Sequence, residues 1–156
     1  MKNILANNYV VMMERTCVII KPDGVKRGLV DEIIRRYENA GLKIIAKKEL
    51  IASDKLLSEH YSAHVGKPFF EPLKKFMMSG PVVAFVLEGE DAIALVRKVT
   101  GATDPSKADK GTIRGDLGVD SQEKADEEQR AIQNLVHASG NKDEADKEIR
   151  LWFPDL

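Results

Sequence analysis

Every pair of predicted β-strands in this sequence is separated by at least one predicted helix. Short runs of β-branched or alternating apolar residues predict four strands, at 15–20, 42–50, 81–87 and 135–137. Apolar residues at helical spacing predict helices at 29–37, 53–64, 69–78 and 91–100, and from 141 towards 151. This order is typical of an α/β or α+β domain. It also fits a split βαβ, ferredoxin-like sheet with a helical pair inserted between the second and third strands. The pattern alone does not distinguish between these architectures.

Two segments in the second half of the chain lack a clear hydrophobic periodicity. Residues 101–118 are polar and are punctuated by glycines and one proline, which predicts a long loop of the kind that is usually functional or disordered. Residues 121–132 are charged and favour helix, but their apolar stripe is thin. We interpret them as a solvated helical excursion.

Length and composition limit the classes of protein to which the chain can belong. A chain of 156 residues suits one domain with a single core, so we expect one domain at 1–156, with 1–13 as an N-terminal extension. The formal net charge of −1 gives no reason to expect nucleic acid or an anionic membrane as the main partner. Cys17 is the single cysteine, which excludes an internal disulfide, and its apolar neighbours predict a buried thiol. Without a signal peptide or a long apolar stretch, we expect a cytoplasmic protein.

The common nucleotide-binding motifs are absent. The sequence contains no Walker A pattern, and no Gly-x-Gly-x-x-Gly follows a predicted strand. Of the three histidines, His60 and His64 lie one helical turn apart, which is also a spacing used by metal ligands. No carboxylate completes a convincing third ligand, so we interpret both as partly exposed surface histidines.

His137 differs from the other histidines in its position. It ends an apolar triplet and precedes Ala138, Ser139 and Gly140, so it projects from a strand end into a loop, where a reactive group would be accessible. A purely structural histidine remains the commoner alternative. Glu148 lies on the closing helix, where a carboxylate bonded to one ring nitrogen would leave the other nitrogen as a base or nucleophile. Spacing alone favours a simple surface charge at Glu148.

Basic residues recur where the chain is irregular. Lys21, Arg97 and Arg114, together with Thr103, offer the charges and forked donors that a polyphosphate requires, although each alone is an ordinary solvated side chain. Phe69 follows a proline at a predicted helix start, so its ring could form a stacking surface at the mouth of a cleft. Burial in the core is the alternative for this ring.

These segments together resemble the nucleoside diphosphate kinase family. The matching segments are KPDGVKRG at 21–28, HY at 60–61, KPFF at 67–70, SGPVV at 79–83, GATDP at 101–105, GTIRGD at 111–116, NLVHAS at 134–139 and EI at 148–149. The resemblance extends from about Glu14 to Phe153. Its most specific part is the Asn-x-x-His-Ala-Ser segment in combination with the Thr-Ile-Arg-Gly-Asp loop.

The resemblance implies a fold and a reaction. The fold is a ferredoxin-like α/β (α+β) sandwich with a four-stranded antiparallel sheet, an inserted helical pair and a long active-site loop. The reaction is ping-pong transfer of the γ-phosphoryl group from a nucleoside triphosphate, typically ATP, to a nucleoside diphosphate, with little base preference, which maintains the NTP and dNTP pools. The implied cofactor is Mg²⁺, carried by the nucleotide phosphates with no direct protein ligand. A homo-oligomer is implied, with a hexamer favoured and a tetramer or dimer possible.

The resemblance also implies roles for individual residues. His137 would be the phosphorylated nucleophile, oriented by Glu148 and Ser139. Phe69 would stack on the base, with Leu73 beside it. The residues expected to contact the phosphates or sugar, or to support the histidine, are Lys21, Tyr61, Arg97, Thr103, Arg114 and Asn134.

The sequence departs from the family pattern in three places. Gly140 and Ala63 stand where acidic residues are usual, which puts outer-sphere help to Mg²⁺ in doubt. The chain is also longer than expected between Arg114 and Asn134, with the excess within 120–133. We predict that this excess forms a helical projection at the active-site rim and alters nucleotide access or subunit contacts.

Two other functions remain as alternatives. A non-catalytic nucleotide-binding regulatory module on the same fold would lack the nucleophile or its orienting group, yet His137 and Glu148 are both present. A histidine-linked protein phosphotransfer component would need a protein-docking surface rather than a stacking phenylalanine and a basic phosphate site.

Overall fold

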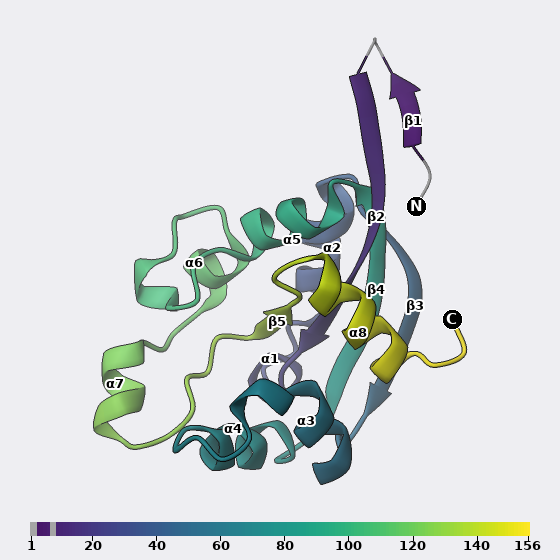
Figure 1. Cartoon of the computed structure of the whole chain (residues 1–156). Helices are drawn as coiled ribbons and strands as arrows, with labels where there is room; N and C mark the ends of the chain where they lie inside the picture. Colours follow the sequence, from purple (N-terminus) through teal and green to yellow (C-terminus); the bar gives the residue numbers. More distant parts are fainter. Residues whose placement is uncertain (1–2, 7–8) are drawn as a thin grey trace.

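A twisted antiparallel sheet forms the centre of the protein, and helices cover both of its faces (Figure 1). The computed structural model describes residues 3–6 and 9–156. The strands are β1 (Asn3–Ala6), β2 (Tyr9–Ile20), β3 (Lys43–Leu50), β4 (Val82–Glu90) and β5 (Val136–Ala138). In the body of the sheet the order is β5-β2-β4-β3, and every neighbouring pair is antiparallel. This order confirms the ferredoxin-like fold that the resemblance implied.

The first strand lies apart from this body. β1 pairs with residues 9–12 of β2, whereas β5 pairs with residues 18–20 of the same strand. The long β2 therefore extends from the core into the part of the chain that projects from the body in Figure 1.

Burial on both sides explains the continuous apolar runs of the central strands. Successive side chains of a strand point to opposite faces, so Cys17 and Ile19 of β2 belong to one hydrophobic cluster and Val18 and Ile20 to the other. The predicted burial of the Cys17 thiol is confirmed.

The five longest helices of the described residues supply most of the two covering layers. Helices α2 (Val30–Asn39) and α5 (Ala92–Thr100) pack on the face of Val18. Helices α3 (Asp54–His60), α4 (Phe70–Met77) and α8 (Lys142–Trp152) pack on the face of Ile19. The pair α3 and α4 is the helical insertion between β3 and β4 that the sequence predicted.

Side-chain caps set the start of several helices. The Ser53 hydroxyl accepts a hydrogen bond from the Leu56 amide at 3.1 Å, and the Asn141 side chain accepts one from the Glu144 amide at 2.9 Å. Both predicted helix starts are therefore confirmed. The helix predicted over 53–64 ends earlier than expected, at His60, and continues only as the 3₁₀ turn η1 (Ser62–His64).

The segment predicted as a loop without helix contains short helical elements. These are η2 (Pro105–Lys107) and α6 (Ile113–Leu117). A further short helix, α1 (Pro22–Lys26), follows β2. The prediction was wrong here because a helix of one or two turns is too short to show a hydrophobic period. A capping signal was present, since Thr112 accepts from the Gly115 amide at 3.0 Å.

The predicted helical excursion is only half helical. Helix α7 spans Gln122–Glu127 and begins at Ser121, whose hydroxyl accepts from the Lys124 amide at 3.1 Å. The following residues leave the helical path because Gln129 adopts a left-handed conformation, with φ of 52°.

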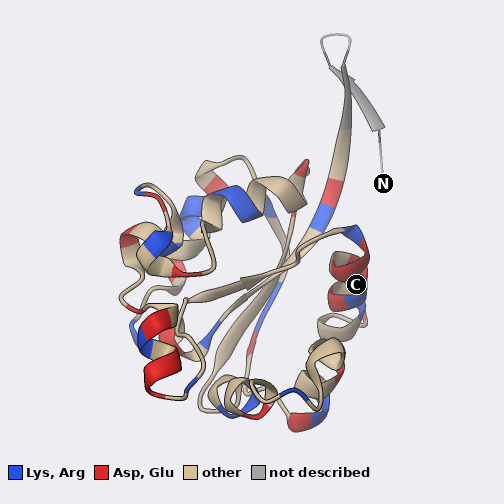
Figure 2. Cartoon of the chain, turned by 60° about the vertical axis from the view of Figure 1, so that its left-hand side comes forward, with Lys and Arg blue, Asp and Glu red and all other residues tan. Residues whose placement is uncertain are grey.

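Acidic and basic residues are interspersed over the molecule (Figure 2), as the small net charge leads one to expect. Among the described residues, no helix combines the length and the apolar composition needed to cross a bilayer.

A buried hydrogen bond joins α2 to α5 and allows a stability test. Tyr37 Oη lies 2.7 Å from Thr100 Oγ1, and Thr100 Oγ1 donates to the Val96 carbonyl, so the Tyr37 hydroxyl is the donor. Tyr37→Phe should lower the free energy of unfolding by about 1 kcal/mol, measured by urea denaturation. Thr100→Val should be at least as destabilising, because it leaves the buried Tyr37 hydroxyl without its acceptor. A smaller loss in Thr100→Val than in Tyr37→Phe would contradict this assignment.

Candidate active site

The strand register places the His137 ring on the α3 and α8 side of the sheet. Residues Val136 and Ala138 point into the opposite cluster and are buried, so His137 between them faces the other way, opposite Ile19. Its side chain remains 20% exposed, whereas its two neighbours are almost completely inaccessible. The ring therefore lies at the edge of the core, where a ligand can reach it.

A strained turn precedes this histidine. Leu135 has φ of 73°, and the Val136 amide donates to the Asn134 carbonyl at 2.8 Å, which closes a three-residue γ-turn. Leu135 is held by neighbours from the start of α1. Its carbonyl accepts from the Lys21 amide at 2.8 Å, and its amide donates to the Asp23 carboxylate at 3.1 Å. Packing, the γ-turn and these two hydrogen bonds thus maintain a conformation that a leucine rarely adopts.

Side chains predicted to bind phosphate gather around the same segment. Lys21 Nζ donates to Asn134 Oδ1 at 2.8 Å, and Asn134 Nδ2 donates to the Thr103 carbonyl at 2.9 Å. Arg97 is exposed, and its guanidinium donates to the Ala138 carbonyl at 3.2 Å. Three stretches far apart in sequence therefore meet beside His137.

Arg114 has a different environment from the one that the sequence suggested. Its side chain is only 3% exposed, and its three nitrogens donate to the carbonyls of Asn134, Gly101 and Val136. A guanidinium has five N–H groups, so one hydrogen on each terminal nitrogen remains for a ligand. Arg114 therefore mainly holds the backbone next to His137 in place, through its hydrogen bonds to the carbonyls of Asn134 and Val136.

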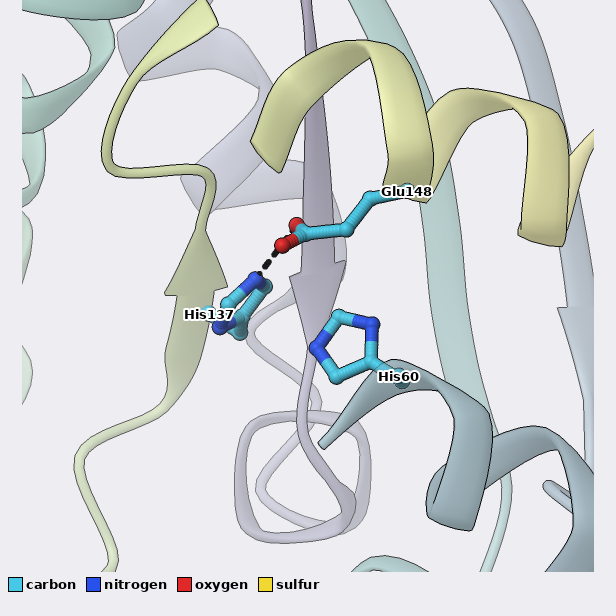
Figure 3. Close-up of side chains that lie close together, drawn as sticks. All are labelled: His60, His137 and Glu148. Atoms are coloured by element: carbon cyan, nitrogen blue, oxygen red, sulfur yellow. Dashed lines mark hydrogen bonds and ion pairs between the residues drawn. The ribbon is translucent and has the colours of Figure 1, made fainter. Parts of the chain in front are cut away.

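Glu148 fixes the orientation of the His137 ring. Helix α8 presents Ala145, Glu148 and Trp152 on its buried face, and Glu148 Oε1 lies 2.7 Å from His137 Nε2 (Figure 3). The Ser139 hydroxyl donates to the same carboxylate oxygen at 2.8 Å. Because a carboxylate only accepts, Nε2 carries the hydrogen and Nδ1 keeps its lone pair. Among the described residues, none forms a hydrogen bond with His137 Nδ1.

Burial and neighbouring cations keep this imidazole neutral. Burial is the largest effect lowering the pKa of His137, and the positive charges of Lys21 and Arg114 lower it further. Burial also raises the pKa of Glu148, but the hydrogen bonds that it accepts favour its ionised form. Burial, followed by repulsion from Arg114, lowers the pKa of Lys21 to about 8. The site thus combines a neutral nitrogen base with a lysine that is largely charged at pH 7.

The interpretation of His60 as a surface residue was wrong. His60 is 7% exposed, its Nδ1 accepts from Trp152 Nε1 at 2.9 Å, and its ring lies edge-on to the His137 ring with centroids 4.6 Å apart (Figure 3). Burial, then the proximity of His137, lowers the pKa of His60 to about 3. Its position on the Leu57 face of α3 was the available signal, since residues three apart share one face of a helix. His64, by contrast, is partly exposed, as predicted.

The cluster of His60, His137 and Glu148 does not make a convincing metal site. Their ligand atoms lie within 4.8 Å of one another, but Glu148 already accepts from two partners and His60 Nδ1 accepts from Trp152. The positions of Ala63 and Gly140 provide no carboxylate.

The remaining predicted residues lie along one side of the site. The Tyr61 ring is nearly buried, with its centroid 6.3 Å from that of His137. Phe69 is 50% exposed at the start of α4 and, together with Leu73, lines a groove. Phe69 is therefore outside the core, whereas Phe70 beside it is buried.

Comparison with known proteins identifies the relatives of the chain. The profile of the family described as nucleoside diphosphate kinase matches residues 14–156. A nucleoside diphosphate kinase of Caldanaerobacter subterraneus is 50% identical over 146 residues, which cover 94% of this chain and 98% of that protein. One from Pyrococcus furiosus is 50% identical over 141 residues, covering 90% and 83%.

Solved structures agree with this relationship. A nucleoside-diphosphate kinase from Borrelia burgdorferi, described as a transition state mimic with bound vanadate and ADP, superposes with a TM-score of 0.88 at 41% identity, covering 92% of this chain and 88% of that one. An NDP kinase from Pyrobaculum aerophilum gives a TM-score of 0.87 at 40% identity, covering 92% and 97%.

The Glu148 contact predicts the tautomer of His137. At pH 7 the ring should be neutral with its hydrogen on Nε2, as read from ¹⁵N chemical shifts of the histidine side chains. Glu148→Gln should weaken this preference, because an amide can present either a donor or an acceptor to the ring. Glu144→Gln is the matched control, since it removes a nearby charge without touching His137. A wild-type ring protonated on Nδ1 at pH 7 would refute the assignment.

Proposed function

This chain belongs to the nucleoside diphosphate kinase family of phosphotransferases, and on that premise we propose that it transfers the γ-phosphoryl group of a nucleoside triphosphate, typically ATP, to a nucleoside diphosphate through a phosphohistidine at His137. The observation that carries the proposal is the His137 ring itself. One nitrogen is bonded to Glu148, and the other, Nδ1, keeps its lone pair. The positive charges of Lys21, Arg114 and Arg97 lie close enough to lower the pKa of the ring.

In the first half-reaction the Nδ1 lone pair attacks the γ-phosphorus. The Nδ1–P bond forms as the bond to the bridging oxygen breaks, and the nucleoside diphosphate leaves with that electron pair. The ring then bears a positive charge, which the Glu148 carboxylate stabilises through Nε2–H. In the second half-reaction a terminal phosphate oxygen of another diphosphate attacks the same phosphorus, and His137 recovers its lone pair.

The surrounding side chains would position the substrate rather than perform covalent chemistry. A loose phosphoryl-transfer transition state needs alignment and positive charge, which Lys21, Arg97 and the free N–H groups of Arg114 supply in this proposal. Tyr61, Thr103 and Asn134 would contact the phosphates or sugar, or support these cations. Phe69 and Leu73 would hold the base, and every base has a π-face on which a phenylalanine can stack.

We also propose that the true substrate is the Mg²⁺ complex of the nucleotide. The ion would neutralise phosphate charge, and the lack of a carboxylate at Ala63 and Gly140 supports its being held by the phosphates. The cytoplasm as location and a homo-oligomer, most simply a hexamer with tetramer and dimer as alternatives, belong to the same proposal. Mass measurement in solution tests the assembly.

Labelling with γ-³²P-ATP tests the reaction directly. The protein should form an acid-labile, alkali-stable phosphoenzyme, and added GDP should chase the label into GTP. A non-catalytic nucleotide-binding module would not be labelled. A phosphotransfer component for protein partners would keep its label when GDP is added.

Replacing the nucleophile should separate chemistry from binding. His137→Asn should abolish labelling while nucleotide affinity, measured by calorimetry, stays within about threefold, because the phosphate-binding cations remain. The matched variant His64→Asn should still be labelled, since His64 makes no contact with His137 Nδ1. Full labelling of His137→Asn would overturn the assignment of the nucleophile.

The pKa of Lys21 predicts an alkaline decline in substrate capture. Lys21 is charged below its pKa of about 8 and loses its charge above it, so kcat/KM for ATP should fall about tenfold for each pH unit beyond that value. Lys21→Arg should have a lower maximal kcat/KM than the wild type, but its kcat/KM should not fall at alkaline pH, because a guanidinium stays charged. Lys26→Arg, at an exposed position in α1, should keep the wild-type profile. A flat wild-type profile up to pH 9.5 would contradict this role.

A further inference from the structure

The two buried cations of the site, Lys21 and Arg114, donate hydrogen bonds to neutral acceptors. The Lys21 ammonium donates to the side-chain amide of Asn134, and the Arg114 guanidinium donates to backbone carbonyls. Neither bond compensates the positive charge. Because a buried charge is costly unless another charge offsets it, two such cations side by side require a carboxylate nearby.

Asp23 in α1 is a buried carboxylate close to both cations. Its negative charge raises the pKa of Lys21 and of Arg114, against the lowering caused by burial. Its Oδ2 accepts from the Leu135 amide at 3.1 Å, whereas its Oδ1 is buried without a hydrogen-bond partner among the described residues. An asparagine could make the same bond to the Leu135 amide without burying a charge. The negative charge itself therefore calls for an explanation.

The same carboxylate holds the turn that precedes His137. Lys21 and Asp23 bind both backbone groups of Leu135, because the Lys21 amide donates to its carbonyl and Asp23 accepts from its amide. Leu135 has the left-handed φ of 73°, and His137 follows two residues later. Without the Asp23 acceptor, a buried amide would be unpaired and the strained turn would lose one of its restraints.

We propose that Asp23 is a positioning residue for phosphoryl transfer, whose carboxylate holds the turn that places His137 and keeps Lys21 charged without occupying its donor groups. This inference rests on the proposed function. The Lys21 ammonium has three N–H groups and gives one to Asn134, so two remain for phosphate oxygens. A direct ion pair would use one of these donors. Asp23 instead bonds the Leu135 amide and acts on Lys21 through its charge alone.

Among the described residues, four titratable or charged groups face Lys21 from four elements. They are Asp23 on α1, Arg114 on α6, His137 on β5 and His60 on α3. Burial lowers the pKa of both histidines to about 3, so they are neutral near pH 7. Arg114 stays positive up to its pKa of about 10. Asp23 is thus the negative charge of the group, and without it Lys21 should lose its proton at a lower pH.

Titration of the Lys21 side chain in the free protein, followed through its ¹³Cε resonance, tests the role of the charge. In Asp23→Asn the pKa of Lys21 should fall by about one unit, because the amide keeps an acceptor for Leu135 but carries no charge. Asp23→Glu keeps the charge, so it should shift this pKa by less than half as much. Asp31→Asn, at an exposed position in α2, is the matched control and should leave the titration unchanged.

The pH dependence of kcat/KM for ATP gives a second readout. The alkaline fall should begin about one pH unit lower in Asp23→Asn than in the wild type. Adding Lys21→Arg to Asp23→Asn should abolish the fall, because a guanidinium stays charged. Asp23→Ala also removes the acceptor for Leu135, so its kcat at neutral pH should be about tenfold or more below that of Asp23→Asn, as His137 loses its alignment.

The outcomes distinguish this inference from the proposed function. Absence of a phosphoenzyme in the wild type would refute the proposed function, whereas the Lys21 titration tests the charge of Asp23 separately. If Lys21 titrates in Asp23→Asn as it does in the wild type, the inference is overturned, because a purely structural aspartate gives that result. Should the variants not fold, the wild type decides. Its Asp23 ¹³Cγ shift should report an ionised carboxylate at pH 7, and a protonated one would overturn the inference.

Discussion

The geometry of the site depends on how the backbone carbonyls of residues 134–138 are held. Arg114 binds two of them, at Asn134 and Val136, the Lys21 amide binds that of Leu135, and Arg97 binds that of Ala138. A left-handed leucine costs about 1–3 kcal/mol, and it persists because these donors come from three separate elements. These hydrogen bonds fix the residue at which β5 begins after the turn. They therefore determine the face of the sheet on which the His137 side chain lies.

The same donors set the electrostatics of the proposed nucleophile. Cations beside a buried imidazole keep it neutral, so its lone pair is available near pH 7, and they also attract phosphate. Glu148 is bonded to the ring at Nε2 and can stabilise the positive charge that arises only after transfer. In the proposed reaction, nearby cations and a carboxylate on Nε2 together favour the phosphorylated ring without protonating the free enzyme.

Local patterns predicted the strands of the sheet body and the longer helices, but not the short helices or the arrangement of the elements. Strand runs, helical periods and the helix starts at Ser53 and Asn141 are properties of neighbouring residues, and the structure confirms them. The sheet order depends on contacts between distant segments and came only from the family resemblance. So did the pairing of Glu148 with His137, since spacing alone favoured a surface charge. The burial of His60 and the clamp made by Arg114 were missed because both depend on what packs against them.

The inserted segment shows why an extension is tolerated so close to a constrained site. Residues 120–133 lie between two fixed points of the chain, Arg114 on α6 and Asn134 beside Lys21, and the Asp120–Arg130 pair closes the neck of the segment. Lengthening a loop with fixed ends adds little closure entropy, because that cost rises only with the logarithm of length. Added residues therefore leave the strand of His137 undisturbed. They project outward from the body of the domain, and Phe69 lies across a groove from them.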